Sequence, residues 1–265
     1  MRADAVERLL LKGTTPLGGV RPRYEDLGLP NVMASALEAL GVHPPSPPVP
    51  TKFLDPELLD SRTIVLVAMD GLGYRQLLTA KRELGGLALL DAAKEDGALF
   101  PITATVPSTT VSGIGSLCTA RTPQEHGLLG YRLYLRGFNT VANMIRFAPI
   151  DRSGPPWDAR GFLAGPTAFE LAREANVPSY VLTRDWFRGS ALSTMLHAGA
   201  ATAGYVAVSD FAVRLRQILA AKGRKLVFAY WDVVDTLSHR HGTEGEEFLS
   251  EIATFDAVLE REVLR

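Results

Sequence analysis

The chain has 265 residues, of which 46% are apolar and 22% charged, ordinary values for a globular protein with a sizeable core. Its 28 Lys and Arg residues nearly balance 29 Asp and Glu residues, without a long run of one sign, which argues against duplex nucleic acid as a partner. Cys118 is the only cysteine, and this excludes an intrachain disulfide and a zinc site built on several thiolates.

The N-terminal stretch lacks the signals of export. Residues 1–16 contain no continuous apolar core followed by a small-residue cleavage site. No stretch of the sequence approaches the roughly 18 to 20 uninterrupted apolar residues of a membrane span. The sequence therefore predicts a cytoplasmic location and no membrane partner.

Residues 1–60 are predicted to form a lead-in, distinct from the rest of the chain. Residues 31–42 have the apolar spacing of a helix, and five prolines between positions 44 and 50 then break regular structure. We expect this proline-rich stretch to be an extended connector laid over the surface.

Residues 61–265 alternate between two patterns. Short apolar runs rich in β-branched residues predict strands at 63–69, 99–106, 177–183 and 225–231. Helical spacing lies between and after them, at 73–95, 110–120, 167–175, 208–222 and 244–263. This alternation predicts an α/β domain with helices on both faces of a sheet. Chemistry in such sheets gathers beyond the carboxyl ends of strands, here Asp70-Gly71, the 107–113 loop and residues 232–242.

Each of these strand ends offers a side chain suited to a metal or a phosphate. Asp70 stands beside Gly71, where a carboxylate suits a divalent cation, although Asp-Gly is also a common turn. The run 107–113, rich in Ser and Thr, lies where a helix should begin, a position where a hydroxyl and backbone N–H groups favour an anion, although Ser and Thr are also ordinary helix caps. Asp235 and His239 are four residues apart and converge on one ion if this turn is helical, the alternative being a surface ion pair or a cap.

The segments VLVAMDGLG, FPITATVPSTTVSGIGSLCTARTPQEHGLLGY and YWDVVDTLSHRHG together resemble the type I phosphodiesterase/nucleotide pyrophosphatase branch of the alkaline phosphatase superfamily. The resemblance spans about residues 62–260, with the motifs in the family's order. The middle segment is the most specific, with Pro-x-x-Thr from Pro107 to Thr110 and Thr-x-x-x-Pro-x-x-His-Gly over 119–127. The resemblance implies a three-layer α/β/α sandwich with a mostly parallel central sheet, C-terminally incomplete, over residues 61–265.

The resemblance also implies the roles of individual residues. Thr110 matches the family's nucleophilic threonine, which is also a metal ligand, and Asp70 matches the first aspartate ligand. Asp235 and His239 match the Asp and His that hold the other metal. The implied cofactors are two divalent ions, zinc or manganese. The implied activity is hydrolysis of phosphodiester or nucleotide pyrophosphate bonds in a small phosphate-ester or nucleotide substrate, through a covalent phosphothreonine.

The sequence departs from the family pattern in two places. Gly113 replaces an asparagine that binds phosphate oxygens in the eukaryotic enzymes, and Asn143 is a candidate substitute. The family's Asp-His-Gly segment and its final histidine are missing, since no Asp-His dipeptide occurs and no histidine follows His241. Each ion would then have two protein ligands, fewer than the usual tetrahedral site, which predicts weak metal affinity and low activity.

Other interpretations stay open at this point. Within the superfamily the chain could be a phosphomonoesterase or a phosphomutase, although the mutases usually present serine as nucleophile. The missing ligands also fit a truncated, catalytically impaired remnant that only binds phosphate. Sheet surface left open by missing strands would favour self-association.

Overall fold

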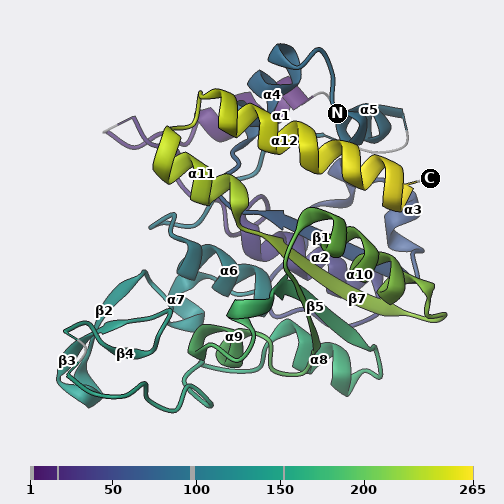
Figure 1. Cartoon of the computed structure of the whole chain (residues 1–265). Helices are drawn as coiled ribbons and strands as arrows, with labels where there is room; N and C mark the ends of the chain where they lie inside the picture. The colour runs from purple at the N-terminus through teal and green to yellow at the C-terminus, as the bar shows by residue number, and fades with distance from the viewer. Residues whose placement is uncertain (1–2, 17, 96–98, 152, 265) are drawn as a thin grey trace.

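A four-stranded parallel sheet lies at the centre of the protein, whose computed structural model describes residues 3–16, 18–95, 99–151 and 153–264 (Figure 1). Its strands are, in spatial order, β1 (Thr63–Met69), β7 (Lys225–Trp231), β5 (Ser179–Arg184) and β6 (Ala201–Tyr205). Every neighbouring pair in this sheet is parallel. The carboxyl ends of the four strands therefore meet along one edge.

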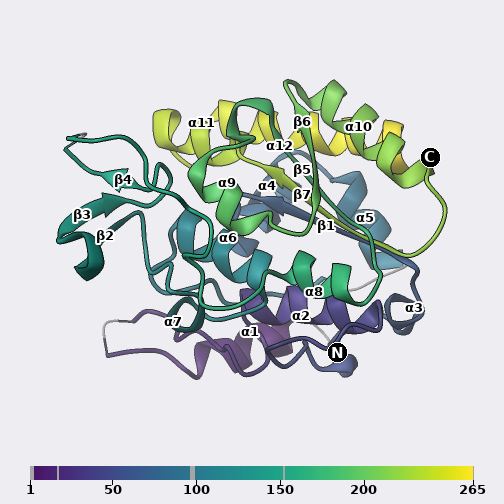
Figure 2. The same cartoon turned by 90° about the horizontal axis from the view of Figure 1, so that it is seen from below.

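Helices cover both faces of this sheet, as Figure 2 shows with α10 to α12 above the strands and α2 and α8 below them. The first group comprises α4 (Tyr74–Glu83), α5 (Ala88–Glu95), α10 (Val208–Ala220), α11 (Val233–His241) and α12 (Glu246–Leu259), followed by a π-helical turn (Glu260–Leu264). The second group comprises α2 (Leu29–Ala39), α6 (Thr110–Thr119), α8 (Ala168–Glu174) and α9 (Ala191–Leu196). The predicted three-layer α/β/α fold with a parallel sheet is confirmed.

Alternation along the strands divides the core into two apolar clusters. In β7, Phe228 belongs to the cluster between the sheet and helices α2 and α8, whereas Val227 and Ala229 belong to the cluster between the sheet and helices α10 and α12. Side chains along a strand point alternately to the two faces of the sheet. The β7 side chains on each face are apolar because helices cover both faces. Its first residue, the buried Lys225, is accommodated because its Nζ donates to the carbonyl oxygens of Ile218, Leu219 and Ala221 at the end of α10.

β1 and β7 have the same length and pair over their whole length, yet they differ in exposure. Every residue of β7 is buried, whereas six of the seven residues of β1 are partly exposed. Within the residues that the structure describes, β1 is an edge strand, with β7 on one side and no strand on the other. The partial exposure of β1 follows from this position.

A second, smaller sheet lies beside the main body, at the left of Figure 1. Its antiparallel strands are β2 (Arg132–Leu135), β3 (Thr140–Asn143) and β4 (Ala148–Pro149). The sequence did not predict these strands or β6, since their short runs lack the continuous apolar pattern of β1 and β7. The remaining short helices are α1 (Ala3–Leu11), α3 (Pro56–Leu59) and α7 (Pro123–His126), with single 3₁₀ turns at Thr51–Phe53, Arg136–Phe138 and Asp185–Phe187.

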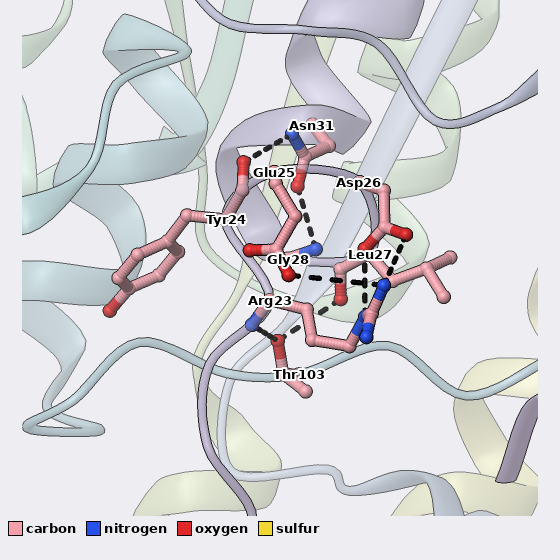
Figure 3. A network of polar contacts seen from close by, with 8 residues as sticks. All are labelled: Arg23, Tyr24, Glu25, Asp26, Leu27, Gly28, Asn31 and Thr103. Atoms are coloured by element: carbon pink, nitrogen blue, oxygen red, sulfur yellow. Dashed lines mark hydrogen bonds and ion pairs between the residues drawn. The ribbon is translucent and has the colours of Figure 1, made fainter. Parts of the chain in front are cut away.

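The strand predicted at 99–106 is wrong, because this segment pairs with the lead-in instead of entering the sheet. Thr103 forms a single parallel bridge with Gly28, and both its backbone N–H and its hydroxyl donate to the Leu27 carbonyl oxygen (Figure 3). The Thr103 hydroxyl also accepts the backbone N–H of Arg23. Pro101, the third residue of the segment, and Pro107, directly after it, lack the N–H groups that a central strand would donate.

Residues of the predicted lead-in pack against the sheet domain. Met33 and Leu37 of α2 are fully buried in the cluster shared with β7. Asn31 holds the loop before α2 in place, since its side chain accepts the Gly28 N–H and donates to the Tyr24 carbonyl oxygen (Figure 3). The same side-chain nitrogen also donates to the Pro47 carbonyl oxygen. A domain division at residue 60 stays a prediction.

No helix within the described ranges combines the length and the apolar character that crossing a membrane requires.

Candidate active site

The carboxyl edge of the sheet brings two of the predicted strand ends together. Asp70 directly follows β1, and its backbone N–H donates to the carbonyl oxygen of Trp231, the last residue of β7, over 2.9 Å. The β1–β7 ladder therefore continues up to Asp70. Helix α11 begins two residues after β7 and carries Asp235 in its first turn.

The two adjacent threonines at the start of α6 have different partners. Thr109 is the N-cap, and its hydroxyl accepts the backbone N–H of Ser112. Thr110 is the first helical residue, and its hydroxyl instead donates to Oδ2 of Asp70 over 3.0 Å. The need for a cap is thus met by Thr109. In the part of the chain that the structure describes, the backbone N–H groups of Thr110 and Val111 donate to no protein acceptor, as expected where a helix can receive an anion.

Asp70 is held by three donors. Besides Thr110, the buried Tyr230 hydroxyl donates to the same Oδ2 over 2.6 Å, and the Gly71 N–H donates to Oδ1 over 3.1 Å. Burial, followed by the negative charge of Asp70, raises the pKa of Tyr230, so this phenol stays a proton donor. We call Asp70, Thr110 and Tyr230 the first half-site.

The second half-site is Asp235 with His239 on α11. The spacing of four residues places the pair on one helix face, and His239 Nε2 lies 3.6 Å from Asp235 Oδ2. The side chain of His239 is 80% exposed and that of Asp235 is 34% exposed. Within the described residues, neither side chain has another ion-pair or hydrogen-bond partner on the protein.

Gly71 brings the two half-sites into contact. Its φ of +75° is in the left-handed region, and a Cβ added there would lie 2.7 Å from the Cα of Asp235. Only glycine lets the two backbones approach this closely. Burial, and next the negative charge of Asp70, raises the pKa of Asp235. The two carboxylates are therefore electrostatic neighbours.

The donors of these half-sites fit divalent metals in kind. Carboxylate, hydroxyl and imidazole are ligands that zinc accepts. Among the described residues, however, no group of three or more His, Cys, Asp and Glu side chains converges as a complete site. Each half-site alone thus offers fewer protein ligands than a four-coordinate ion requires.

Asn143, the predicted substitute for a phosphate-binding asparagine, lies at the end of β3 with both polar ends in use. Its Nδ2 donates to the Tyr131 hydroxyl, and its Oδ1 accepts the backbone N–H groups of Ile145 and Arg146. These contacts fold the turn after β3. A role in substrate binding stays a prediction.

His126, in the His-Gly part of the motif, is a buried packing residue. Its Nδ1 accepts the Leu128 backbone N–H, which leaves the proton on Nε2, 3.1 Å from the Ser116 hydroxyl. The ring lies against Gly115, where a Cβ would be 2.7 Å from Cε1. Burial lowers the pKa of His126 to about 4, so the ring is neutral near pH 7.

Three residues that the sequence did not single out support the site. Tyr230 bonds Asp70, as described above. The Tyr24 hydroxyl accepts the Val106 N–H and so connects the lead-in to the loop before Thr110. Arg184 donates to Asp232, directly before α11, over 2.7 Å, with both side chains largely buried. Tyr230 is the penultimate residue of a strand whose parallel pairing with β1 only the structure reveals.

The family described as type I phosphodiesterase / nucleotide pyrophosphatase matches residues 64–262. Among solved structures, the chain resembles phosphonoacetate hydrolase from Sinorhizobium meliloti in complex with phosphonoformate, with a TM-score of 0.56 and 20% identity over 74% of this chain and 51% of that one. It also resembles an inactive variant of murine ectonucleotide pyrophosphatase / phosphodiesterase 5 in complex with AMP, with a TM-score of 0.51 and 14% identity over 77% of this chain and 52% of that one. No curated protein matches the chain. The chain thus spans about half the length of these solved structures.

Proposed function

Because the chain belongs to the type I phosphodiesterase / nucleotide pyrophosphatase family, we propose that it is a metal-dependent hydrolase that cleaves phosphodiester or nucleotide pyrophosphate bonds through a phosphothreonine at residue 110. One observation carries the proposal. The Thr110 hydroxyl is the first side chain of α6, is not used as a cap, and is hydrogen-bonded to Asp70 at the carboxyl edge of the sheet.

Each described group has a place in this reaction. Two divalent ions, zinc or manganese, would be held by Asp70 with Thr110 and by Asp235 with His239, and would supply a lowered hydroxyl pKa and positive charge near the phosphate. The unpartnered N–H groups at the start of α6 would orient a phosphate oxygen. Asp70 Oδ2, which already accepts the hydrogen bond of Thr110, is the acceptor closest to the hydroxyl proton.

The proposed reaction has two steps. In the first, the Thr110 hydroxyl loses its proton, a bond forms between Oγ1 and phosphorus, and the leaving oxygen departs with the electron pair of its broken bond and takes up a proton. In the second, water attacks the phosphorus and loses a proton, the bond between phosphorus and Oγ1 breaks, and Oγ1 takes up a proton, which regenerates the threonine hydroxyl. The phosphonoacetate, phosphonoformate and AMP bound to the similar solved structures support a small phosphorus compound as substrate.

The test is hydrolysis of bis-p-nitrophenyl phosphate with added zinc or manganese, comparing wild type with Thr110→Ala and Thr109→Ala. We expect Thr110→Ala to lower the rate at least about a thousandfold, because the nucleophile is gone. Thr109→Ala removes the cap and costs about 1 kcal/mol of stability, with a much smaller loss of rate. A chelator should abolish turnover.

Covalent trapping identifies the nucleophile directly. Acid quenching during turnover of the diester should leave a p-nitrophenyl phosphate group esterified to the peptide that contains Thr110, detected by mass spectrometry and missing from Thr110→Ala. Equal rates for the folded Thr110→Ala variant and wild type would refute the mechanism and favour a phosphate-binding remnant. Faster hydrolysis of p-nitrophenyl phosphate than of the diester would instead indicate a phosphomonoesterase.

A further inference from the structure

A small cavity adjoins the predicted nucleophile. It measures about 70 Å³ and is bounded by Thr110 and Tyr230, the two side chains that donate to Asp70. Most of its remaining wall is apolar, formed by Ile114, Ile145, Phe187, Leu192, Leu196 and Phe228. The described lining contains no Asp, Glu, Lys or Arg. A group that enters from the reacting centre would therefore leave water for an uncharged, mostly apolar surface.

One polar group in this wall lacks a partner. His197, directly after α9, lines the cavity, and its Nδ1 is buried without a hydrogen bond to any described residue. Burial lowers the pKa of His197 to about 4, so the ring is neutral near pH 7 and can accept or donate one hydrogen bond at this atom. A buried polar atom left unpaired destabilises a fold, and such an atom beside a cavity marks a place where a ligand or a water molecule can bond.

We propose that this cavity is a substrate subsite for a short, uncharged aliphatic group of about three carbons on the phosphorus compound, ending in a hydroxyl or carbonyl that bonds Nδ1 of His197. The proposal rests on the function proposed above, because Thr110 marks where the phosphorus would lie. It narrows the substrate class to compounds with a small alkyl substituent.

The volume of the cavity sets the size of the group. A cavity of about 150 Å³ holds a benzene molecule, and one of roughly 10 to 15 Å³ holds a single water molecule. A cavity of about 70 Å³ thus admits a propyl-sized group and excludes a nucleobase. A nucleotide would have to place its base outside this cavity.

The test measures binding of four phosphorus compounds to the full chain in the presence of zinc: inorganic phosphate, methylphosphonate, n-propylphosphonate and 3-hydroxypropylphosphonate. Each buried CH₂ group strengthens binding about fourfold, so n-propylphosphonate should bind about 15-fold more tightly than methylphosphonate. The hydroxyl should add a further factor of about three to ten. Methyl resonances of Ile114 and Leu196 should shift with the two propyl compounds and not with phosphate.

Two matched variants on α9 test whether the preference for the propyl group arises in this cavity. Ser193 lines the cavity whereas its neighbour Thr194 does not. Ser193→Leu should therefore abolish the preference for the propyl group, and Thr194→Leu should keep it. His197→Phe should remove only the advantage of the hydroxyl. Thermal unfolding of each variant verifies that it is folded.

The outcomes separate this proposal from the proposed function. Equal affinity for methyl- and propylphosphonate, with phosphate still bound beside Thr110, would overturn the subsite and leave the hydrolase proposal standing. A propyl preference that survives in Ser193→Leu would also overturn it. Shifts of Ile114 and Leu196 with 2-propanol alone, without any binding of phosphate, would support the cavity as a ligand site while counting against the hydrolase proposal.

Discussion

The two half-sites lie side by side but are built differently. Asp70 of the first half-site follows a strand and receives three hydrogen bonds, two from side chains on α6 and β7. Asp235 and His239 of the second half-site both lie on α11, and the imidazole is mostly exposed. The first half-site is therefore organised without a ligand, whereas the second has a single contact of 3.6 Å between two side chains of one helix.

In the second half-site, a bound ion would have to fix the positions of side chains that the protein alone does not fix. Holding two exposed side chains in one geometry costs side-chain entropy, which a surface ion pair barely offsets. In the first half-site, hydrogen bonds between separate elements already order the side chains before any ion binds. We expect phosphate and metal to change the position of Asp235 and His239 more than that of Asp70 and Thr110.

The largest expected effect on stability comes from Gly71→Ala, which forces the half-sites apart. A Cβ at this position meets the Cα of Asp235 at 2.7 Å, in addition to the strain of a φ of +75°. We expect a loss of about 3 kcal/mol, combining the left-handed backbone and the overpacking. Urea denaturation measures this loss.

Gly85→Ala is the matched control. Its φ is +73°, and a Cβ there meets nothing within 4 Å. Backbone strain alone should cost about 1 kcal/mol. Equal losses for the two variants would mean that the two half-sites are not held in backbone contact.

A double-mutant cycle for each half-site should give the next largest difference. Coupling between Asp70 and Tyr230, from Asp70→Ala, Tyr230→Phe and the double variant, should be about 2 kcal/mol, because a buried hydroxyl bonds a charged group. Coupling between Asp235 and His239 should be below about 0.5 kcal/mol. Chemical denaturation of the metal-free protein measures both, and similar coupling energies would contradict the distinction between the half-sites.

The smallest expected effect is the pH dependence of Asp235. Burial and the charge of Asp70 raise its pKa in the folded protein, so its contribution to stability is fully present below the unfolded pKa and is lost as the pH rises through the folded pKa. Asp235→Asn should therefore stabilise the metal-free protein at pH 7, by less than about 1 kcal/mol because the site is partly exposed. This gain should shrink toward about pH 4. A gain that stays constant with pH would show that the carboxylate charge is not its cause.

The sequence was sufficient for the two strands with continuous apolar runs, and much less so elsewhere. β1 and β7 occupy the predicted residues, since continuous β-branched and aromatic runs leave few alternatives. The segment 99–106 has a similar pattern but contains Pro101, is followed by Pro107 and pairs with the lead-in, a long-range contact that no local pattern reveals.

The same limit applies to the candidate site. Asp70, Asp235 and His239 could be named because each follows a predicted strand end. Thr110 was distinguished from the neighbouring Thr109 only by the resemblance to the family motif. Tyr230 could not, because its hydroxyl reaches Asp70 only through the register in which Tyr230 lies opposite Ala68. The contact between Gly71 and Asp235 was equally hidden, since Asp-Gly is a common turn dipeptide in any protein.

The outer side of β1 is a place where a further strand could add next to both half-sites. Within the described residues, its backbone N–H and C=O groups on this side have no neighbouring strand. A segment that added there in parallel, from a longer polypeptide or from a second molecule, would finish its run next to Asp70. Its following loop would deliver new side chains directly to both half-sites. Gaining a strand and gaining further side chains at the half-sites would then be a single event.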